Sequence, residues 1–498
     1  MKSQYLCLLA YILIFPTLLS CSSSSDEKGE QTPYLETSYS DPVHVDLDKI
    51  KERGKLIAIS SYSPTSYFIY RGQPMGYEYE LLKRLANYLE LDLEIKIAYN
   101  LDNFIEMLNT GEGDLVAHSL SITKPRKKFV DFTEHYTVTR QVLVQRKPEN
   151  WRKMKLHEID KQLIRDPLEL IGKTVHVRKN SSYYRRLINL SQEMGGDIIV
   201  EPLDGNLETS EIIKMVNNGE IEYTIADEDI ARINQTYYRD LDVATAVSFP
   251  QRLAWMVRKT SPKLKAKVNQ WLAEEKKGSD FYAIYNKYYK NQKRFRTRVS
   301  SEYFSLTGGK ISEYDEAIQS SAAALGWDWK LLASQIYQES RFEPETESWA
   351  GAKGLMQLMP STAKEIGDYN LYDAEESIKA GVKYLQKMSK YYRDIPDSVE
   401  RIKFVLATYN AGPGHIRDAR RLAEKYGKNP DVWTENVEDF ILLKSQKKYY
   451  SDPVVSNGYC RGEEPYNYVN DIFKRYQVYQ DLLETKAADE EAVALQKP

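Results

Sequence analysis

The chain has 498 residues, more than one ordinary hydrophobic core accommodates, so roughly two to four domains are expected. Hydrophobic residues make up 42% and charged residues 28%, which is typical of a soluble globular protein. The formal net charge of -3 argues against a dedicated nucleic-acid binder, because such proteins usually carry a strong basic excess.

An export signal is predicted at the N-terminus. Lys2 precedes an apolar run over residues 5–19, which is shorter than a typical membrane-spanning helix. The run ends in Leu-Leu-Ser-Cys, which resembles a bacterial lipobox and implies cleavage before Cys21 and lipid attachment to that cysteine. Residues 1–20 are therefore interpreted as a lipoprotein signal peptide, and the alternative is an uncleaved anchor with an incidental cysteine.

Cysteine and histidine usage argues against disulfides and metal sites. Cys7 would leave with the signal and Cys21 would be acylated, so Cys460 would stand alone without a disulfide partner. The six histidines form no zinc-type cluster, and no metal or cofactor is predicted. Residues 21–45 are polar and almost free of aliphatic side chains, so they are expected to form a flexible tether.

Strand and helix patterns alternate from about residue 46 to residue 290. Helical spacing of leucines is found in residues 77–90, and a second helix around residues 104–108 ends at Gly111. Strands are predicted at residues 56–62, 91–99 and 114–119. This alternation indicates an α/β domain with a mainly parallel sheet.

Three stretches of this region resemble the extracellular solute-binding family that takes up polar amino acids. They read GKLIAISSYSPTSYFIYRGQPMGYEYELLKRLA, LNTGEGDLVAHSLSITKPRKKFVDFT and LIGKTVHVRKNSSYYRRL, in the order expected for that family. The resemblance implies two α/β lobes that close on an amino acid or small peptide.

The same resemblance implies a set of ligand-binding residues. The family usually holds the ligand's carboxylate with an arginine, here Arg126, and its amino group with an acid of the second lobe, here Asp227. Arginine suits this role because it binds a carboxylate bidentately. The alternative is that Arg126 is solvated and that Asp227 is one of several surface charges in Ala-Asp-Glu-Asp. Hydroxyl groups expected to add hydrogen bonds are Ser121, Thr123, Ser181 and Ser182.

A basic run leaves the α/β pattern at residues 291–310, which are interpreted as a solvated helix end and linker; contact with an anionic polymer is the alternative. Helical periodicity dominates residues 311–485, and residues 486–498 are a polar tail. Asp328 is predicted to cap one helix, and Asp397 to cap another that ends at Gly412. This second folded region is therefore expected to be all-α.

Glu339 continues the apolar stripe of the helix that Asp328 begins, after Leu332 and Ile336. A carboxyl group desolvated in that position should have a raised pKa and hold a proton near neutral pH. No histidine, cysteine or second acid stands at a recognisable catalytic spacing from it.

Four motifs of the helical region resemble the soluble lytic transglycosylase domain, which has a lysozyme-like fold. They are Glu-Ser at 339–340, Gly-Leu-Met-Gln at 354–357, Thr-Tyr-Asn-Ala-Gly at 408–412 and Tyr-Asn-Tyr-Val at 466–469. Two longer stretches, GPGHIRDARRLAEKYGKNPDVW and NGYCRGEEPYNYV, together with the lipobox and the α/β domain, resemble the membrane-bound lytic murein transglycosylase F family over the whole chain. Departures are Thr408 and Cys460, where that family has alanine.

The resemblance assigns Glu339 as the catalytic acid and base. A hydrolytic glycosidase generally needs two carboxylates. Lytic transglycosylases instead use the 6-hydroxyl of the muramic sugar as nucleophile, so one carboxylate suffices and a 1,6-anhydro end results. Residues expected to bind substrate or orient the reacting groups are Ser340, Gly354, Met356, Gln357, Tyr409, Asn410 and Tyr468. For Tyr409 and Met356 the alternative is a simple core position.

The sequence therefore predicts a two-lobed α/β periplasmic solute-binding domain followed by an all-α lysozyme-like domain. Its expected partners are peptidoglycan glycan strands, an amino acid or small peptide, and the outer membrane, to which it would be lipid-anchored facing the periplasm. A non-catalytic cell-wall-binding or sensing lipoprotein is the alternative. An uptake receptor would leave the helical domain unexplained.

Overall fold

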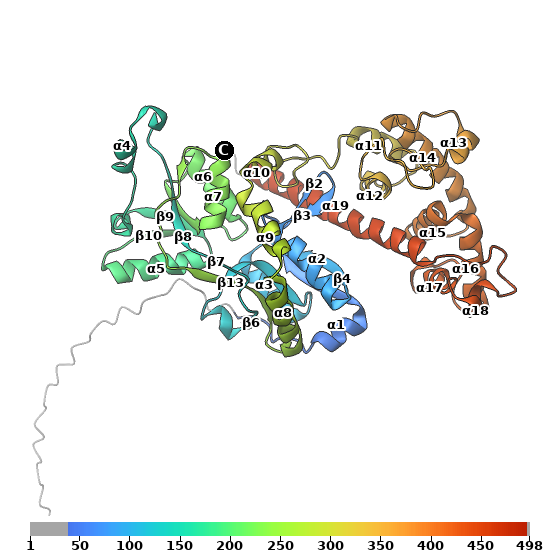
Figure 1. The fold of residues 1–498 in the computed structure, drawn as a ribbon, viewed down its shortest axis with the longest axis horizontal. Coiled ribbons are helices and arrows are strands. Elements are labelled where there is room, and N and C mark those ends of the chain that lie inside the picture. The colour runs from blue at the N-terminus through green and yellow to red at the C-terminus, as the bar shows by residue number, and fades with distance from the viewer. Residues whose placement is uncertain (1–37, 496–498) are drawn as a thin grey trace, which may run out of the picture. The chain divides into compact units, whose positions relative to one another are not determined.

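The computed structural model describes residues 38–495, with side chains up to residue 483. The predicted signal peptide, the lipidation site Cys21 and most of the predicted tether lie outside this range. None of the helices in the described part of the chain has the length and apolar character that a membrane crossing requires. About half of the described residues are helical, and Figure 1 shows the arrangement of these helices.

The first lobe of the α/β domain is built on a mixed sheet in the order β4-β1-β5-β13-β6, with β7 paired to β13. Strands β1, β4 and β5 are parallel, and β13 runs antiparallel to β5. The predicted α/β domain is therefore confirmed, but its sheet is mixed and not mainly parallel, because β13 pairs antiparallel with β5, β6 and β7. The elements of this lobe are α1 (Leu47–Arg53), β1 (Lys55–Ser60), β2 (Phe68–Tyr70), β3 (Gln73–Met75), α2 (Tyr77–Leu89), β4 (Asp92–Ile97), α3 (Leu101–Thr110), β5 (Leu115–Ser121), β6 (Val130–Phe132), β7 (Thr137–Thr139), β13 (Gln251–Arg258), α8 (Pro262–Glu275) and α9 (Ser279–Tyr285).

The second lobe has its own sheet, in the order β10-β9-β11-β8-β12. The chain enters this lobe between β7 and β8 and returns between β12 and β13, so the two lobes are joined by two crossings (Figure 1). Its elements are β8 (Gln141–Arg146), α4 (Leu156–Asp160), β9 (Thr174–Arg178), α5 (Ser182–Met194), β10 (Ile199–Leu203), α6 (Thr209–Asn218), β11 (Tyr223–Asp227), α7 (Glu228–Tyr237) and β12 (Leu241–Asp242).

Local capping explains where several helices begin and end. Asn100 accepts hydrogen bonds from the first turn of α3, and Gly111 ends that helix in the left-handed conformation, as predicted. Asp328 and Asp397 likewise accept from the first turns of α12 and α15. The ends at Gly111, Asp328 and Asp397 are specified by neighbouring residues, which is why the sequence alone located them; the cap at Asn100 was not predicted.

Residues 39–45 pack on the first lobe, so the predicted tether, drawn to residue 45, is too long. The Tyr39 hydroxyl donates to Asp102 at 3.0 Å, and the Val43 amide donates to the carbonyl of Asn109 at 2.9 Å. Thr260 donates to the carbonyl of Val43 at 2.6 Å. The apolar and aromatic side chains of this short segment find partners that its polar composition concealed.

The predicted linker at residues 291–310 is also more ordered than expected. It contains α10 (Gln292–Val299), and both Phe295 and Phe304 are 1% exposed. The Arg298 guanidinium is 5% exposed and lies 5.3 Å from the ring centroids of Phe68 and Tyr288. The interpretation of this basic run as a solvated helix end is therefore wrong for Arg298, because cation–π contacts compensate part of its desolvation.

The helical domain confirms the predicted all-α region. Its elements are α11 (Asp315–Ala323), α12 (Trp329–Ser340), α13 (Pro360–Ile366), α14 (Ala374–Ser389), α15 (Ser398–Ala411), α16 (Pro413–Lys425), α17 (Glu438–Leu443), α18 (Lys447–Tyr450) and α19 (Glu463–Leu495). The long helix α19 packs against α12 and α15, and Figure 1 shows it running on to the hairpin β2–β3. There the Tyr479 hydroxyl donates to the carbonyl of Gly72 at 2.9 Å. The backbone of α19 includes residues 486–495, which were predicted to be a polar tail.

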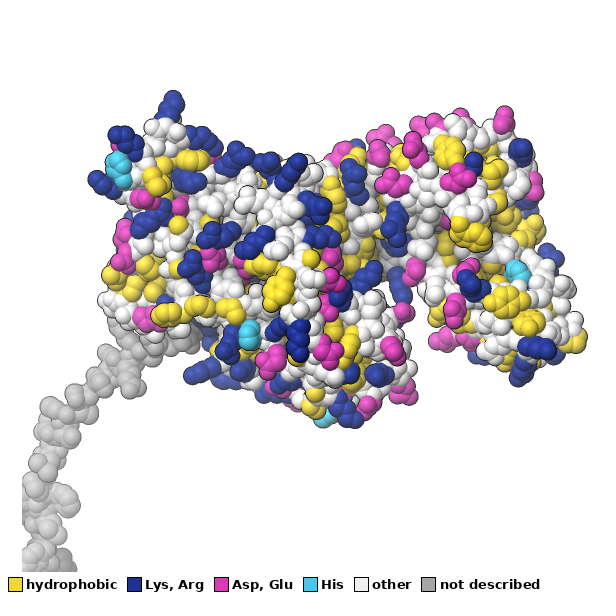
Figure 2. Space-filling view, viewed as in Figure 1, with side chains coloured by type: hydrophobic (Ala, Val, Ile, Leu, Met, Phe, Trp, Pro, Cys, Tyr) yellow, Lys and Arg dark blue, Asp and Glu magenta, His cyan; other side chains and the backbone are white. Residues whose placement is uncertain are grey.

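Short helical turns complete the chain: η1 (Arg126–Lys128), η2 (Trp151–Lys153), η3 (Pro167–Leu170), η4 (Asn286–Lys290), η5 (Lys390–Tyr392) and η6 (Trp433–Val437). On the face drawn in Figure 2, Lys and Arg side chains are numerous over the α/β domain, whereas Asp and Glu side chains gather along one edge of the helical domain. The near-neutral net charge of -3 thus results from charges of both signs.

Candidate active site

Helix α12 carries Glu339 in its last turn. Leu332 and Ile336, at spacings of seven and three residues before Glu339, are fully buried, so the predicted stripe is confirmed. The helix stops because Arg341 and Phe342 adopt the left-handed conformation, with φ of 55° and 64°. Glu339 therefore lies at a helix end whose position is fixed by the buried face behind it.

Burial raises the pKa of Glu339 from its ordinary 4.5 to about 7, and the hydroxyl of Tyr468, which donates to Oε1, opposes that rise. The side chain keeps a partly exposed surface. A carboxyl group with this pKa is partly protonated near neutral pH, so it can both give and take a proton.

Helices α15 and α19 bring two tyrosines to this carboxylate. Tyr468 of α19 is 6% exposed, and its pKa is raised by burial and by the nearby charge of Glu339. Tyr409 of α15 donates to the carbonyl of Met356 at 2.6 Å, and burial followed by the charge of Glu339 raises its pKa as well. Residues separated by up to 129 positions therefore meet around one acid.

The hydroxyl of Ser340 donates to the carbonyl of Ile336 at 3.2 Å, and its side chain is 5% exposed. In this structure Ser340 thus bonds to its own helix backbone. Its expected part in orienting the groups around Glu339 stays a prediction. Asn410 follows Tyr409 and is exposed, so its amide faces solvent.

The segment Gly-Leu-Met-Gln has a structural reason for its residue types. A Cβ atom at Gly354 would lie 1.8 Å from the carbonyl oxygen of Leu371, and the residue has φ of 75°. Gly354 therefore lies close to protein backbone, and its expected contact with substrate stays a prediction. The Met356 side chain is fully buried and packs in the core. Gln357 donates through Nε2 to the carbonyls of Thr346 and Gly354, both at 2.9 Å, which braces this turn.

Sequence reasoning missed Gln335, a wholly buried polar residue one turn before Glu339. Its Nε2 donates to the Tyr468 hydroxyl at 3.2 Å. The signal that could have found it is its spacing of four from Glu339, which places both side chains on one face of α12.

A second constellation lies in the α/β domain. Asp227 ends β11 and is 4% exposed; burial, with the like charge of Asp229, raises its pKa to about 7, and the charge of Arg126 opposes this rise. Oδ1 of Asp227 is buried without a hydrogen-bond partner among the described residues. Arg126 lies at the start of η1 and donates through Nη1 to the carbonyl of Ser121 at 3.1 Å. The structure therefore brings the predicted arginine and acid within electrostatic reach of each other.

The predicted hydroxyl residues lie at the start of α5, at the end of β5 and in the loop between β5 and η1. Ser181 caps α5 by accepting from the amide of Tyr184 at 3.4 Å. Ser182 accepts from Nε2 of Gln141 at 3.1 Å, a residue that sequence reasoning did not single out. Ser121 is 3% exposed at the end of β5, and Thr123 follows it with a half-buried side chain.

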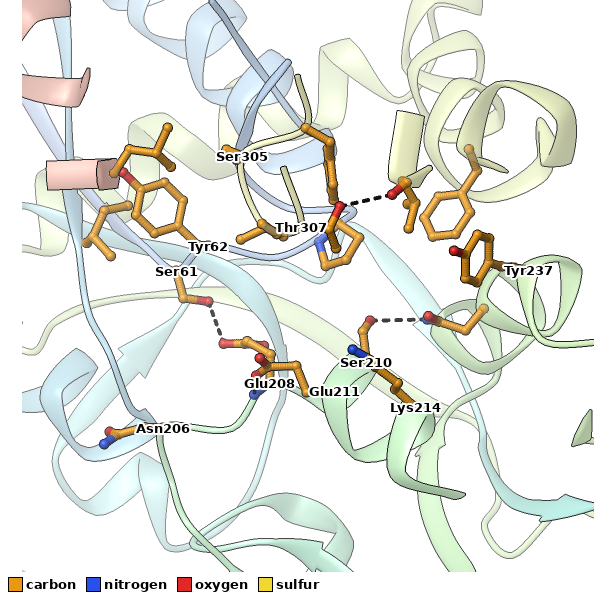
Figure 3. Close-up of a pocket in the computed structure, with 18 of the residues that line it drawn as sticks. Ser61, Tyr62, Asn206, Glu208, Ser210, Glu211, Lys214, Tyr237, Ser305 and Thr307 are labelled. Atoms are coloured by element: carbon orange, nitrogen blue, oxygen red, sulfur yellow. Dashed lines mark hydrogen bonds between the residues drawn. The ribbon is translucent and has the colours of Figure 1, made fainter. Parts of the chain in front are cut away.

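A cavity of about 330 Å³ is lined by both lobes, by α10 and the residues after it, and by Leu482 of α19. Figure 3 shows most of the side chains that line it. Ser61, after β1, donates to Oε1 of Glu208 at 3.1 Å and thereby joins the lobes. Nδ2 of Asn234 donates to Ser210 at 3.1 Å on the opposite wall. Tyr62 and Thr307 line the same space, which the sequence did not predict.

No group of three or more His, Cys, Asp or Glu side chains that could hold a metal ion occurs among the described side chains, those of residues 38–483. Cys460 is the free cysteine of this range and is buried. Burial raises its pKa, which keeps the thiol protonated and unreactive.

Comparison with protein families divides the chain as the fold does. Residues 55–291 match the model of bacterial extracellular solute-binding proteins, family 3, and residues 316–432 match the transglycosylase SLT domain. Among solved structures, the P235GK mutant of ArgBP from T. maritima covers 49% of this chain and 99% of its own, with 26% identity and a TM-score of 0.41.

Relatives extend the similarity across both domains. A protein of Desulfosudis oleivorans named membrane-bound lytic murein transglycosylase F is 36% identical over 442 residues, which cover 89% of this chain and 92% of the relative. A protein of the same name from Photobacterium profundum is 32% identical over 433 residues, covering 87% of this chain and 81% of its own. The chain belongs to the membrane-bound lytic murein transglycosylase F family.

Proposed function

We propose that this protein is a peptidoglycan lytic transglycosylase that cleaves the β-1,4 bond between N-acetylmuramic acid and N-acetylglucosamine and leaves 1,6-anhydromuramic ends. The observation that supports this most is the environment of Glu339. Its pKa is raised to about 7 by burial, and the one described side chain that opposes the rise is a tyrosine, not a second acid or a base.

The reaction balances with one carboxyl group. Protonated Glu339 gives its proton to the glycosidic oxygen as the bond from that oxygen to C1 of the muramic sugar breaks. The oxygen of the 6-hydroxyl then forms a bond to the same C1, and its proton passes to the Glu339 carboxylate. The acid is regenerated, no water is consumed, and a pKa near 7 suits both halves of this cycle.

Neighbouring residues position these steps. Tyr468 donates to Oε1 of Glu339 and limits the motion of the carboxyl group. Tyr409, held by its bond to the Met356 carbonyl, presents its ring beside the acid, where it can pack on the sugar. The exposed amide of Asn410 and the carboxamide oxygen of Gln357 are groups of a kind that hydrogen-bonds to sugar hydroxyl groups.

The α/β domain is proposed to bind an amino acid or small peptide and to regulate cleavage. Arg126 would bind the ligand's carboxylate and Asp227 its ammonium group, whose positive charge would stabilise the buried carboxylate. Hydrogen bonds would come from the hydroxyl groups of Ser121, Thr123, Ser181 and Ser182. Lipidation of Cys21 would hold the protein at the outer membrane, facing the periplasm.

The activity is tested by mass spectrometry of purified peptidoglycan digested with residues 22–498, beside the Glu339→Gln variant. Products lighter by one water than hydrolytic fragments, formed by the unsubstituted protein alone, are expected. Ordinary reducing ends would instead identify a hydrolase, and equal activity of the variant would reassign the acid.

Ligand binding is tested separately by thermal unfolding with a panel of amino acids and cell-wall peptides. A ligand present at about 100 times its Kd should stabilise the protein by about 2.7 kcal/mol. Asp227→Asn should abolish that stabilisation, because a neutral amide cannot pair with an ammonium group. No effect of any ligand would refute this part of the proposal.

A further inference from the structure

A buried hydrogen-bond chain ends on the catalytic carboxyl group. Nε2 of Gln335 lies 3.2 Å from the hydroxyl of Tyr468, and that hydroxyl donates to Oε1 of Glu339. Gln335 is 0% exposed and Tyr468 is 6% exposed, so water does not compete for these bonds. This series of hydrogen bonds runs from Gln335 on α12 to Tyr468 on α19 and then to Glu339 on α12.

The donor and the acceptor in each of these two hydrogen bonds follow from the number of protons that each group carries. A tyrosine hydroxyl has one proton and can also accept hydrogen bonds. Because Tyr468 gives its proton to Glu339, a neighbour at hydrogen-bond distance must donate to it. The amide NH2 group of Gln335 does so.

Gln335 is an unusual choice for this position. Its Oε1 is buried without a hydrogen-bond partner among the described residues. Leu332 and Ile336, its neighbours on α12, are fully buried apolar side chains. An apolar side chain would avoid the cost of an unsatisfied buried acceptor, so packing alone does not account for a glutamine.

We propose that Gln335 is a positioning residue that keeps Tyr468 as a donor to Oε1 of Glu339 and thereby places the transferable proton on Oε2. This inference rests on the proposed function. With its acceptor position filled by Gln335, Tyr468 cannot take the proton of a protonated Glu339. Without Gln335, the hydroxyl can turn and accept from Oε1, which holds the proton on the wrong oxygen.

The other titratable groups facing the carboxyl are also tyrosines. Tyr409 of α15 interacts electrostatically with Glu339, and Tyr384 of α14 lies behind it, with the two rings 5.3 Å apart. Both hydroxyl groups are neutral at physiological pH because burial raises the pKa of each. Among the groups that face this carboxyl, Glu339 itself is therefore the one that titrates between pH 5 and 9.

The test substitutes Gln335→Met, which keeps the length and removes the donor. The expected result is a fall of about tenfold or more in kcat with KM little changed, because the loss concerns proton transfer and not binding. The alkaline limb of kcat should move up by about half a unit to one unit, because a Tyr468 that is no longer polarised stabilises the carboxylate less well. Melting temperature should not fall.

Ser334→Ala is the matched control, because Ser334 is also 0% exposed on α12 and its hydroxyl bonds to the carbonyl of Lys330 at 2.7 Å. It should leave the pH profile unchanged. The decisive measurement is the double variant Gln335→Met/Tyr468→Phe, which should match Tyr468→Phe alone if Gln335 acts through Tyr468.

Additive losses in the double variant, or a fall in kcat without movement of the alkaline limb, would overturn the proposal. So would full activity of Gln335→Met. Failure of the proposed function is distinguishable, since the unsubstituted protein would then form no anhydro products.

Discussion

Glu339→Gln should stabilise the protein at alkaline pH although it abolishes cleavage. Burial raises the pKa of Glu339 to about 7, whereas in the unfolded chain it keeps its ordinary 4.5. A raised acid pKa means that the folded state resists ionisation, so a free-energy penalty appears as pH rises through 4.5 and is complete above 7. The difference of about 2.5 pKa units, at about 1.4 kcal/mol each, amounts to about 3 kcal/mol at pH 8 and less than about 1 kcal/mol at pH 5.

A neutral glutamine escapes this penalty and can still accept the hydrogen bond from Tyr468. The melting temperature should therefore rise by about 6–12 °C at pH 8 but by only a few degrees at pH 5, taking about 2–4 °C per kcal/mol for a unit of this size. The measurement is thermal unfolding of both proteins at the two pH values. Glu343→Gln is the control, because Glu343 is exposed in the same segment. A change in melting temperature that is equal at both pH values would show that Glu339 is solvated, and the catalytic reasoning would lose its basis.

Two further substitutions test contacts that stabilise the helical domain around the site. Lys444→Met should lower the free energy of unfolding in urea by about 3 kcal/mol, because Nζ of the fully buried Lys444 lies 2.7 Å from the fully buried carboxylate of Asp418. Asp418 would keep Arg421 at 3.8 Å and hydrogen bonds from Ser456 and Asn457, so the loss should lie at the low end for a broken buried pair. A loss under about 1 kcal/mol would mean that water reaches the pair. Gly354→Ala should lower the free energy of unfolding by well over about 2 kcal/mol. An alanine in the left-handed conformation costs about 1–2 kcal/mol by itself, and here its Cβ would also lie 1.8 Å from the carbonyl oxygen of Leu371. Gly351→Ala is the matched control, with φ of 89° and no atom within 4 Å of the added Cβ, and equal costs at the two glycines would refute the clash.

Local signals in the chain predicted much of the architecture. Asp328 and Asp397 cap their helices through contacts with the next few residues, and Gly111 ends α3 because glycine adopts the left-handed conformation without strain. The position of Glu339 on a buried stripe also follows from residue spacing within one helix. Such features depend on neighbours along the chain, so a sequence displays them directly.

Long-range contacts escaped prediction. The basic run around Arg298 looked solvated, yet Phe68 and Tyr288 enclose its guanidinium. The segment 39–45 looked like a tether, yet Asn109 and Thr260 hold it. In both cases the partner is distant in sequence and the residue type alone favours solvent.

By itself, the sequence determined the two domains, the helix that carries Glu339 and the desolvation that prepares its carboxyl group for proton transfer. Only the tertiary structure decided which groups surround that carboxyl. Tyr468 reaches it across 129 residues, and Gln335 acquires a role through the tyrosine and not through its own spacing. The pKa of Glu339 is raised because the face of α12 that carries it is buried, and the residue spacing within that helix already indicates this. The direction of the hydrogen bond between Tyr468 and Glu339 depends in addition on Gln335, which donates to the tyrosine. These three side chains meet only when α12 and α19 pack.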